Sequence, residues 1–323
     1  LYLAILIMLA LILPNLIWQY QNGFPVLYHM NELSRTQLVN INSSDFLIAQ
    51  AMFFTGALPV LAFGLFALIS YKPFKKYRFL FLSFFITLFI FIALSAKGYY
   101  AIGLYPVYFA FGAVYAENIF KIRKFILFKA ILILLPVVYG WLISRIALPN
   151  VSPEEIVNNP GRWERTGMLK WEDGKNHHLP QDFADMLGWK ELASKAGQAV
   201  ESIRNPHHTI VICDNYGQAG AINFYSKKGI RANSFNADYL YWFDLSVEYK
   251  NLVRIVTKED AEEELATLKQ YFETATFYDS IANPLARESG TSILVFTNAF
   301  ININEVISAE IMIEKSKISG VNE

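Results

Sequence analysis

The chain has 323 residues, a formal net charge of zero and a single cysteine, Cys213, with a mean hydropathy of +0.29. One cysteine excludes an internal disulfide, and we expect it to lie in an apolar core. The zero net charge conceals two unlike parts. Residues 1–148 hold 11 basic and 3 acidic residues, a charge of +8, whereas residues 149–323 hold 17 and 25, a charge of −8. This split is typical of a lipid-embedded part joined to a soluble part, with a boundary near Pro149.

The first apolar run, at residues 1–13, ends before Pro14. It is shorter than the roughly 20 apolar residues that cross a ~30 Å hydrocarbon core. No basic residue precedes it, as a secretory signal would require. We therefore interpret it as a partial helix and expect the chain to be the C-terminal portion of a longer protein.

The next segment, residues 14–46, interleaves aromatic and polar side chains, which is typical of headgroup depth. We predict an outward interfacial loop or a short surface helix here. Its acids, Glu32 and Asp45, are in principle candidates for a general base. The solvated-loop interpretation is favoured for both.

Four apolar runs follow, each close to the length of a membrane span. We predict transmembrane helices at residues 47–70, 79–95, 99–118 and 125–148. The chain is therefore expected to be an integral, multi-pass protein of the cell (inner) membrane.

Basic residues crowd into alternate gaps between these runs, and neither gap contains an acid. The first gap contains Lys72, Lys75, Lys76 and Arg78, and the second contains Lys121, Arg123 and Lys124. The positive-inside rule makes both gaps cytoplasmic. The gap around Lys97 and all residues after Leu148 then face outward, so the soluble part is expected to be extracytoplasmic.

Lys97 is the one charged residue in the outward gap and is followed closely by Tyr99 and Tyr100. An ammonium beside two phenolic hydroxyls can hold a phosphate, which suggests a contact with a lipid-linked substrate. The alternative is a lysine that snorkels from a helix end. Spacing alone favours the alternative, whereas the outward position of a positive charge favours the phosphate contact.

Residues 149–323 alternate strand and helix patterns, which predicts a soluble α/β layer domain with a largely parallel sheet. We expect strands at residues 209–213, 252–256 and 292–296, and helices at residues 183–203, 219–225 and 258–271. The tail, residues 301–323, is predicted to be a further strand with a frayed end.

Two possible ligand motifs in this domain have simpler interpretations. The adjacent pairs His177-His178 and His207-His208 cannot readily place both rings on one tetrahedral ion, so surface histidines are favoured over a zinc site. The turn that starts at Asp214 lacks the glycines of a phosphate loop, so a helix cap is favoured over anion binding. We assign no metal ligand and no cofactor.

Several strings together resemble one protein family. Pro14-Asn15-Leu16-Ile17-Trp18-Gln19, Asn22-Gly23-Phe24-Pro25, Lys97-Gly98-Tyr99-Tyr100 and Leu104-Tyr105-Pro106 resemble the membrane part of bacterial protein-mannosyltransferase-like glycosyltransferases. Leu179-Pro180-Gln181-Asp182-Phe183-Ala184-Asp185-Met186-Leu187-Gly188-Trp189 and Asn215-Tyr216-Gly217-Gln218-Ala219-Gly220-Ala221-Ile222 look like their extracytoplasmic domain.

The resemblance implies the C-terminal part of a GT-C fold: an α-helical polytopic membrane bundle followed by a soluble α/β domain. It implies transfer of a sugar from a polyprenyl-phosphate-linked donor to an unidentified acceptor on the outer membrane face. Family members carry the catalytic carboxylate in an early outward loop, which we expect this chain to lack, so we assign no catalytic residue and expect the chain alone to be inactive.

The motif match places Lys97, Tyr99 and Tyr100 at the donor phosphate, and it places Trp18, Gln19 and Asn22 on the facing substrate loop. Membrane lipid is an expected partner, and nucleic acid is not. The alternative function is a non-enzymatic membrane protein with an extracytoplasmic binding domain.

Overall fold

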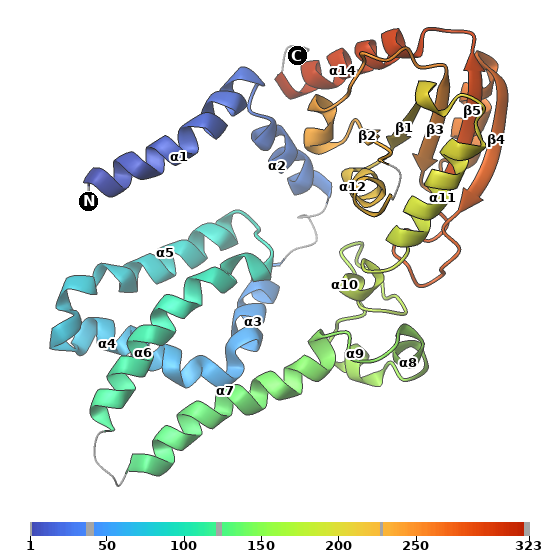
Figure 1. The fold of residues 1–323 in the computed structure, drawn as a ribbon. Coiled ribbons are helices and arrows are strands. Elements are labelled where there is room, and N and C mark those ends of the chain that lie inside the picture. Colours follow the sequence, from blue (N-terminus) through green and yellow to red (C-terminus); the bar gives the residue numbers. More distant parts are fainter. Residues whose placement is uncertain (1, 37–41, 121–124, 227–228, 320–323) are drawn as a thin grey trace. The chain divides into compact units, whose positions relative to one another are not determined.

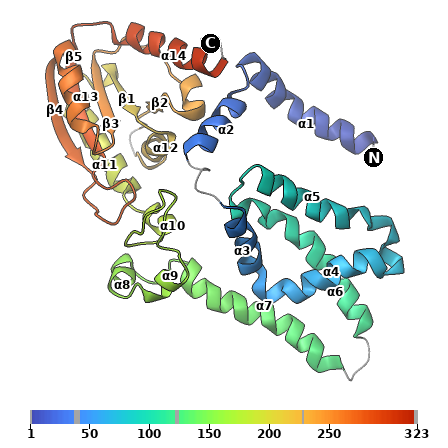
Figure 2. The ribbon, with the colours of Figure 1, turned by 180° about the vertical axis from the view of Figure 1, so that it is seen from behind.

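The computed structural model describes residues 2–36, 42–120, 125–226 and 229–319 (Figures 1 and 2). The chain divides into two compact units. The helical unit is Glu32–Asn176, and the sheet unit combines Leu1–Asn31 with His177–Glu323.

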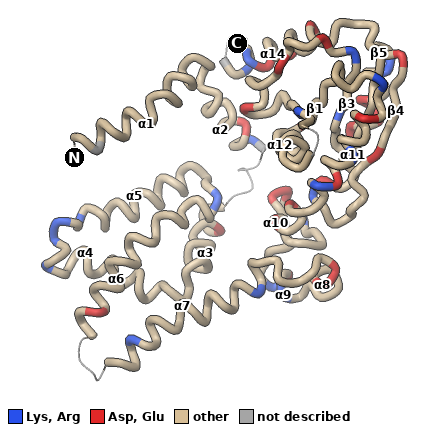
Figure 3. Tube along the Cα trace, in the orientation of Figure 1, with Lys and Arg blue, Asp and Glu red and all other residues tan. Residues whose placement is uncertain are grey.

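The helical unit consists of α-helices joined by short 3₁₀ segments. Its α-helices are α3 (Ser43–Phe54), α4 (Leu58–Ser70), α5 (Phe79–Ala93), α6 (Tyr105–Ile119), α7 (Ile126–Ala147), α8 (Pro153–Asn158) and α9 (Gly161–Arg165). Its 3₁₀ segments are Thr55–Ala57, Lys72–Tyr77 and Gly98–Leu104. Figure 3 shows that the charges of α3–α7 gather toward the ends of these apolar helices.

Two of the four expected spans are long and apolar enough to cross a membrane, namely Ser43–Ser70 and Ile126–Ala147. The other two are shorter than predicted. The second run forms the 15-residue α5, and the third begins as the 3₁₀ segment before the 15-residue α6. Ser95 has a left-handed backbone (φ 50°), which an α-helix cannot contain, so α5 ends before it.

The core of the helical unit is built from aromatic side chains. Tyr105 and Tyr108 of α6 are each 2% exposed. Phe84 of α5 meets them edge-on, with ring centroids 5.6 and 4.8 Å away. Edge-to-face pairs of this kind add specific geometry to simple area burial.

The residues just after α7 stay in the helical unit. The Trp163 indole of α9 donates a hydrogen bond to the carbonyl of Ile146 at 3.1 Å, and the Arg162 guanidinium donates to that of Arg145 at 3.3 Å. These bonds satisfy carbonyls that the end of α7 leaves without helical partners. The helical unit accordingly continues past α7 to Asn176.

The sheet unit begins with two helices, where the sequence predicts a partial helix at residues 1–13 followed by an interfacial loop or a short surface helix. These are α1 (Tyr2–Gln21) and α2 (Pro25–Thr36). Helix α2 continues past Asn31, where the first segment of the sheet unit ends. Pro14 lies inside α1, so the helix does not stop where residues 1–13 were predicted to end. The pair is bent by 75° at residues 22–24, and taken together it is also apolar and long enough for a broken span or a re-entrant segment.

The sheet has five strands in the order β2-β1-β3-β5-β4. The strands are β1 (Thr209–Cys213), β2 (Ala232–Ser234), β3 (Asn251–Val256), β4 (Phe272–Ser280) and β5 (Ser292–Ala299). Strands β2, β1 and β3 are parallel, whereas β5 is antiparallel to both β3 and β4. The predicted largely parallel sheet is thus a mixed sheet, because β4 and β5 form a hairpin that the prediction missed.

The helices of this unit differ from the predicted ones in two places. They are α10 (Gln181–Ala184), α11 (Trp189–Ser202), α12 (Tyr216–Tyr225), α13 (Ala261–Leu268) and α14 (Ile303–Ser319). Short 3₁₀ segments occur at Pro206–His208, Ala237–Tyr241 and Lys269–Tyr271. The expected helix at residues 183–203 is broken at Gly188, whose φ of 86° suits glycine. The expected strand in the tail is the helix α14.

The sheet unit has three layers, α/β/α, because side chains alternate across each strand. Val211 and Cys213 of β1 pack with α11 and α12 on one face. Ile210 and Ile212 pack on the other face, where α13 and α14 contribute residues such as Ile307. Cys213 is buried in this core, as predicted.

Candidate functional site

The turn that carries Lys97 is held on α3 by a buried glutamine. Gln50, which is 6% exposed, donates hydrogen bonds to the carbonyls of Phe46 at 3.1 Å and Gly98 at 2.9 Å. Its side-chain oxygen accepts a hydrogen bond from the Tyr105 hydroxyl at 3.2 Å. A buried amide with three partners fixes the backbone of the turn.

Glycine is required at the second position of this turn. A Cβ built on Gly98 would lie 2.8 Å from the Cβ of Ala49, closer than two carbon atoms can approach. Gly98 thus lets the turn lie directly on α3, which positions the residues on either side of it.

Lys97 forms an ion pair with Glu172, which lies 75 residues further along the chain. The lysine side chain is 18% exposed and the glutamate side chain 35%. Tyr99 and Tyr100 lie beside them with their rings edge-to-face at 4.8 Å, and both are about half exposed. The structure therefore brings together the three residues that the sequence predicted here and adds Glu172, which it did not.

The turn carries a firmly protonated lysine. Burial alone would lower the pKa of Lys97, but the hydrogen bond and the charge of Glu172 outweigh burial, and the pKa is raised. At neutral pH the turn therefore presents a positive charge together with a Tyr99 hydroxyl that can donate a hydrogen bond.

Trp18, Gln19 and Asn22 lie in the sheet unit, where they shape the bend between α1 and α2. The Asn22 side chain donates to the Trp18 carbonyl at 2.8 Å, and Gln19 Oε1 accepts from the Val26 amide at 3.3 Å. The Trp18 ring meets Tyr241 edge-on at 5.1 Å. The structure gives each residue a local contact in this unit, and their role in a substrate loop stays a prediction.

Of the two histidine pairs, His178, His207 and His208 are exposed and His177 is half-buried. His208 Nδ1 lies 2.7 Å from the carbonyl oxygen of Glu248. In the described part of the chain, no three His, Cys, Asp or Glu side chains are grouped to hold a metal ion. Asn215 caps α12 by accepting from the Gln218 amide at 2.9 Å, as predicted.

A charged cluster lies next to this cap, at the ends of β1 and β3. Asp214 contacts the Arg254 guanidinium at 2.6 Å and accepts from the Thr257 amide at 2.9 Å. Arg254 also contacts Glu264 of α13 at 2.7 Å. These contacts link two strands and a helix.

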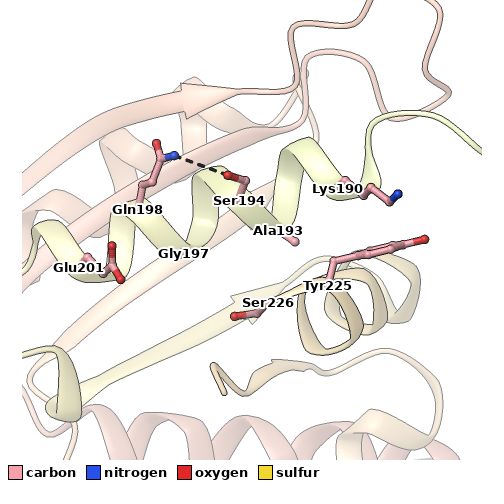
Figure 4. A pocket seen from close by; sticks show the side chains of 8 residues that line it. All are labelled: Lys190, Ala193, Ser194, Gly197, Gln198, Glu201, Tyr225 and Ser226. Carbon is pink, nitrogen blue, oxygen red and sulfur yellow. Dashed lines mark hydrogen bonds between the residues drawn. The ribbon is translucent and has the colours of Figure 1, made fainter. Parts of the chain in front are cut away.

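A second candidate site is a pocket of about 660 Å³ between α11 and the end of α12 (Figure 4). Its lining is Lys190, Ala193, Ser194, Gly197, Gln198, Glu201, Tyr225 and Ser226. Its size lies in the range usual for small-molecule sites, roughly 300–1,000 Å³. Sequence reasoning missed this pocket, although its polar residues recur at helical spacing along the solvent side of α11.

Comparison with known proteins gives no further assignment. No protein-family model matches the chain, and neither a curated protein nor a solved structure matches it.

Proposed function

We propose that this chain belongs to a membrane glycosyltransferase that transfers a sugar from a polyprenyl-phosphate-linked donor to an acceptor on the outer face of the cell membrane. In this proposal Lys97, Tyr99 and Tyr100 contact the donor phosphate. In this proposal the protein crosses the membrane several times, and the residues after Leu148 lie on the extracytoplasmic side.

The observation that carries the proposal is the ion pair between Lys97 and Glu172. Lys97 follows α5, whereas Glu172 follows α7, so the pair requires these two segments to lie on the same side of the membrane. The basic gaps in the sequence assign both segments to the outer side. The contact thus supports a topology in which Lys97 lies at the outer leaflet, on a turn held by Gln50 and Gly98. In that position Lys97 can bind a lipid phosphate.

Glu172 has the charge that a donor would bring. A sugar phosphodiester carries one negative charge, as the Glu172 carboxylate does. The phosphodiester can therefore replace the carboxylate as the ion-pair partner of Lys97 without a change in the net charge of the pair. The half-exposed hydroxyls of Tyr99 and Tyr100 then donate hydrogen bonds to the phosphate oxygens. Lysine suits this role because its ammonium binds phosphate as a point charge on a flexible stem.

The first experiment measures binding of undecaprenyl phosphate and of undecaprenol to the full chain in detergent by native mass spectrometry. Lys97→Ala is expected to weaken binding of the phosphate lipid about tenfold, the effect of losing one charge-assisted hydrogen bond. Binding of undecaprenol, which has no phosphate, is expected to stay unchanged. Glu172→Gln is expected to strengthen phosphate binding, because it removes the competing charge.

Lys76→Ala is the matched control, since Lys76 also lies beside a tyrosine, with its Nζ 4.8 Å from the ring centroid of Tyr77. This lysine occupies the gap assigned to the cytoplasmic side. If both alanine variants weaken phosphate binding equally, the specific role of Lys97 is lost. Full turnover of a lipid-linked donor by the Lys97→Ala enzyme would also remove that role.

A further inference from the structure

The pocket between α11 and α12 is elongated along α11. Its lining residues on α11 run from Lys190 to Glu201, eleven positions apart, which is about 16 Å along a helix. Tyr225 and Ser226 form the opposite wall (Figure 4). A ligand that fills the pocket must therefore be elongated rather than compact.

Small residues make up the floor of the pocket. Ala193 is 2% exposed, and Gly197 brings no side chain. A Cβ added to Gly197 would have the Ile230 Cδ1 atom as its nearest neighbour among the described atoms, at 3.7 Å. The pocket thus exists because these two positions of α11 are small.

The polar lining has no excess of either charge. Lys190 and Glu201 offset each other, and Ser194, Gln198 and Ser226 add hydroxyl and amide groups that donate and accept. A phosphate would call for an excess of cations, and a metal ion would call for grouped acidic oxygens. A neutral ligand with many hydroxyl groups fits this lining best.

Tyr225 supplies an aromatic surface at one end of the pocket. Its side chain lies across from Lys190 in Figure 4, and the Lys190 Nζ is 5.6 Å from the ring centroid. A half-exposed ring of this kind can pack against the apolar C–H face of a sugar while the hydroxyls at the sugar's edge reach the polar lining.

We infer that this pocket binds a short, neutral oligosaccharide. Its identification as the acceptor site rests on the proposed glycosyl transfer. Saccharide binding itself does not depend on transfer, and the two can be measured separately.

The experiment is saturation-transfer NMR on the full chain with three neutral probes: maltotriose, N,N′,N″-triacetylchitotriose and mannotriose. The detergent is lauryldimethylamine oxide, because a maltoside headgroup would compete for the pocket. We expect saturation of the ring protons of at least one trisaccharide. Tyr225→Ala is expected to raise the Kd about fivefold, the effect of losing one aromatic contact, whereas Tyr225→Phe is expected to keep binding.

A second variant, Gly197→Leu, tests the pocket without endangering the fold. Leucine is a better helix former than glycine and would fill the floor, so binding is expected to vanish while the melting temperature is kept. Tyr216→Ala, which changes another exposed tyrosine of α12, is the control and is expected to leave the Kd unchanged.

Three results would overturn the inference: no saturation by any of the three sugars, equal losses in the Tyr225 and Tyr216 variants, or equal binding of a neutral hexapeptide. If no sugar binds while Lys97→Ala still weakens lipid-phosphate binding, only this inference fails. If sugars bind and the Lys97 variant has no effect, the saccharide site stands and the proposed transfer fails.

Discussion

Gly64 of α4 and Gly112 of α6 lie against each other, so that the two helix backbones touch. A Cβ built on Gly112 would lie 1.9 Å from the carbonyl oxygen of Val60, and one built on Gly64 would lie 2.2 Å from that of Tyr108. Two non-bonded atoms cannot approach as closely as either distance. Small residues at helix contacts are the usual means by which apolar helices pack closely in a lipid environment.

We expect Gly112→Leu to separate α4 from α6 and to lower stability by about 3 kcal/mol, the upper part of the range for overpacking. Thermal unfolding in detergent measures the loss. Gly140→Leu is the matched control, because a Cβ added to Gly140 of α7 meets no described atom within 4 Å. Equal melting temperatures for the two variants would contradict a role for the glycine contact.

Gln50→Leu should loosen the Lys97 turn from α3. The change removes hydrogen bonds to Gly98 and Tyr105 and leaves buried polar groups without them, which typically costs about 1–3 kcal/mol. If the glutamine positions the turn, binding of undecaprenyl phosphate should weaken while binding of undecaprenol stays the same. Gln198→Leu, in the sheet unit, should leave the phosphate lipid unaffected, and a loss there would point to a general effect of polar substitutions.

The ion pairs of Lys195 should make stability depend on acid pH. Lys195 Nζ of α11 lies 3.0 Å from Asp279 of β4, and this hydrogen bond is the main reason that the Asp279 pKa is lowered. The stabilisation is present above the ordinary aspartate pKa of about 3.9 and is lost as pH falls through the lowered value.

We therefore expect Lys195→Met to cost about 0.5–1 kcal/mol at pH 7, a small value because these side chains are partly solvated. The gap in melting temperature between the wild type and this variant should close as the pH is lowered below about 3.9. A gap that persists at pH 2 would mean that packing of the lysine stem, not its charge, is responsible.

Cys213 should report unfolding of the sheet unit. Burial raises the pKa of its thiol far above the usual range, and the side chain is 1% exposed. N-ethylmaleimide reacts with the thiolate, so labelling should occur only through unfolding and should become complete in guanidinium. In the Cys213→Ser background, Thr267→Cys on the exposed side of α13 should label at once. Comparable rates at both positions would disprove the burial of Cys213.

The sequence predicts the three strands that are apolar on both faces and misses two, the polar three-residue β2 and the largely exposed β4. Strands β1, β3 and β5 were recognised because sheet and helices bury nearly every residue in them. In strand β4 only Phe272 is buried, the other residues are exposed or half-buried, and Glu273 and Asp279 are charged, so its sequence pattern resembles a loop. The hairpin it forms with β5 turns the expected parallel sheet into a mixed one.

In the tail, residues 301–323, a hydrophobic period typical of a strand overlaps with one typical of a helix. Ile301-Asn302-Ile303-Asn304 alternates apolar and polar residues as a strand would. In the structure Ile303, Ile307 and Ile311 recur every four residues and pack on the sheet as one face of α14. The longer pattern decides the conformation because it extends over more residues and buries more apolar area.

For the candidate site, the sequence identified the residues that are neighbours along the chain and none that are distant. Lys97, Tyr99 and Tyr100 form one motif, whereas Gln50 and Glu172 come from segments 48 and 75 residues away. No local sequence pattern around Gln50 or Glu172 indicates that either residue belongs to the site. Their contacts depend on how helices and turns pack, which no short window contains.

The pairing of β4 with β5 is irregular, and this irregularity affects aggregation of the protein at high concentration. As the outermost strand of the sheet, β4 presents one side of its backbone away from β5. Its pairing shifts register between Phe277 and Asp279, as in a β-bulge. An uninterrupted nine-residue edge would be a template for strands of other molecules. The bulge breaks the regular spacing of that template, and it thereby protects the sheet from edge-to-edge aggregation.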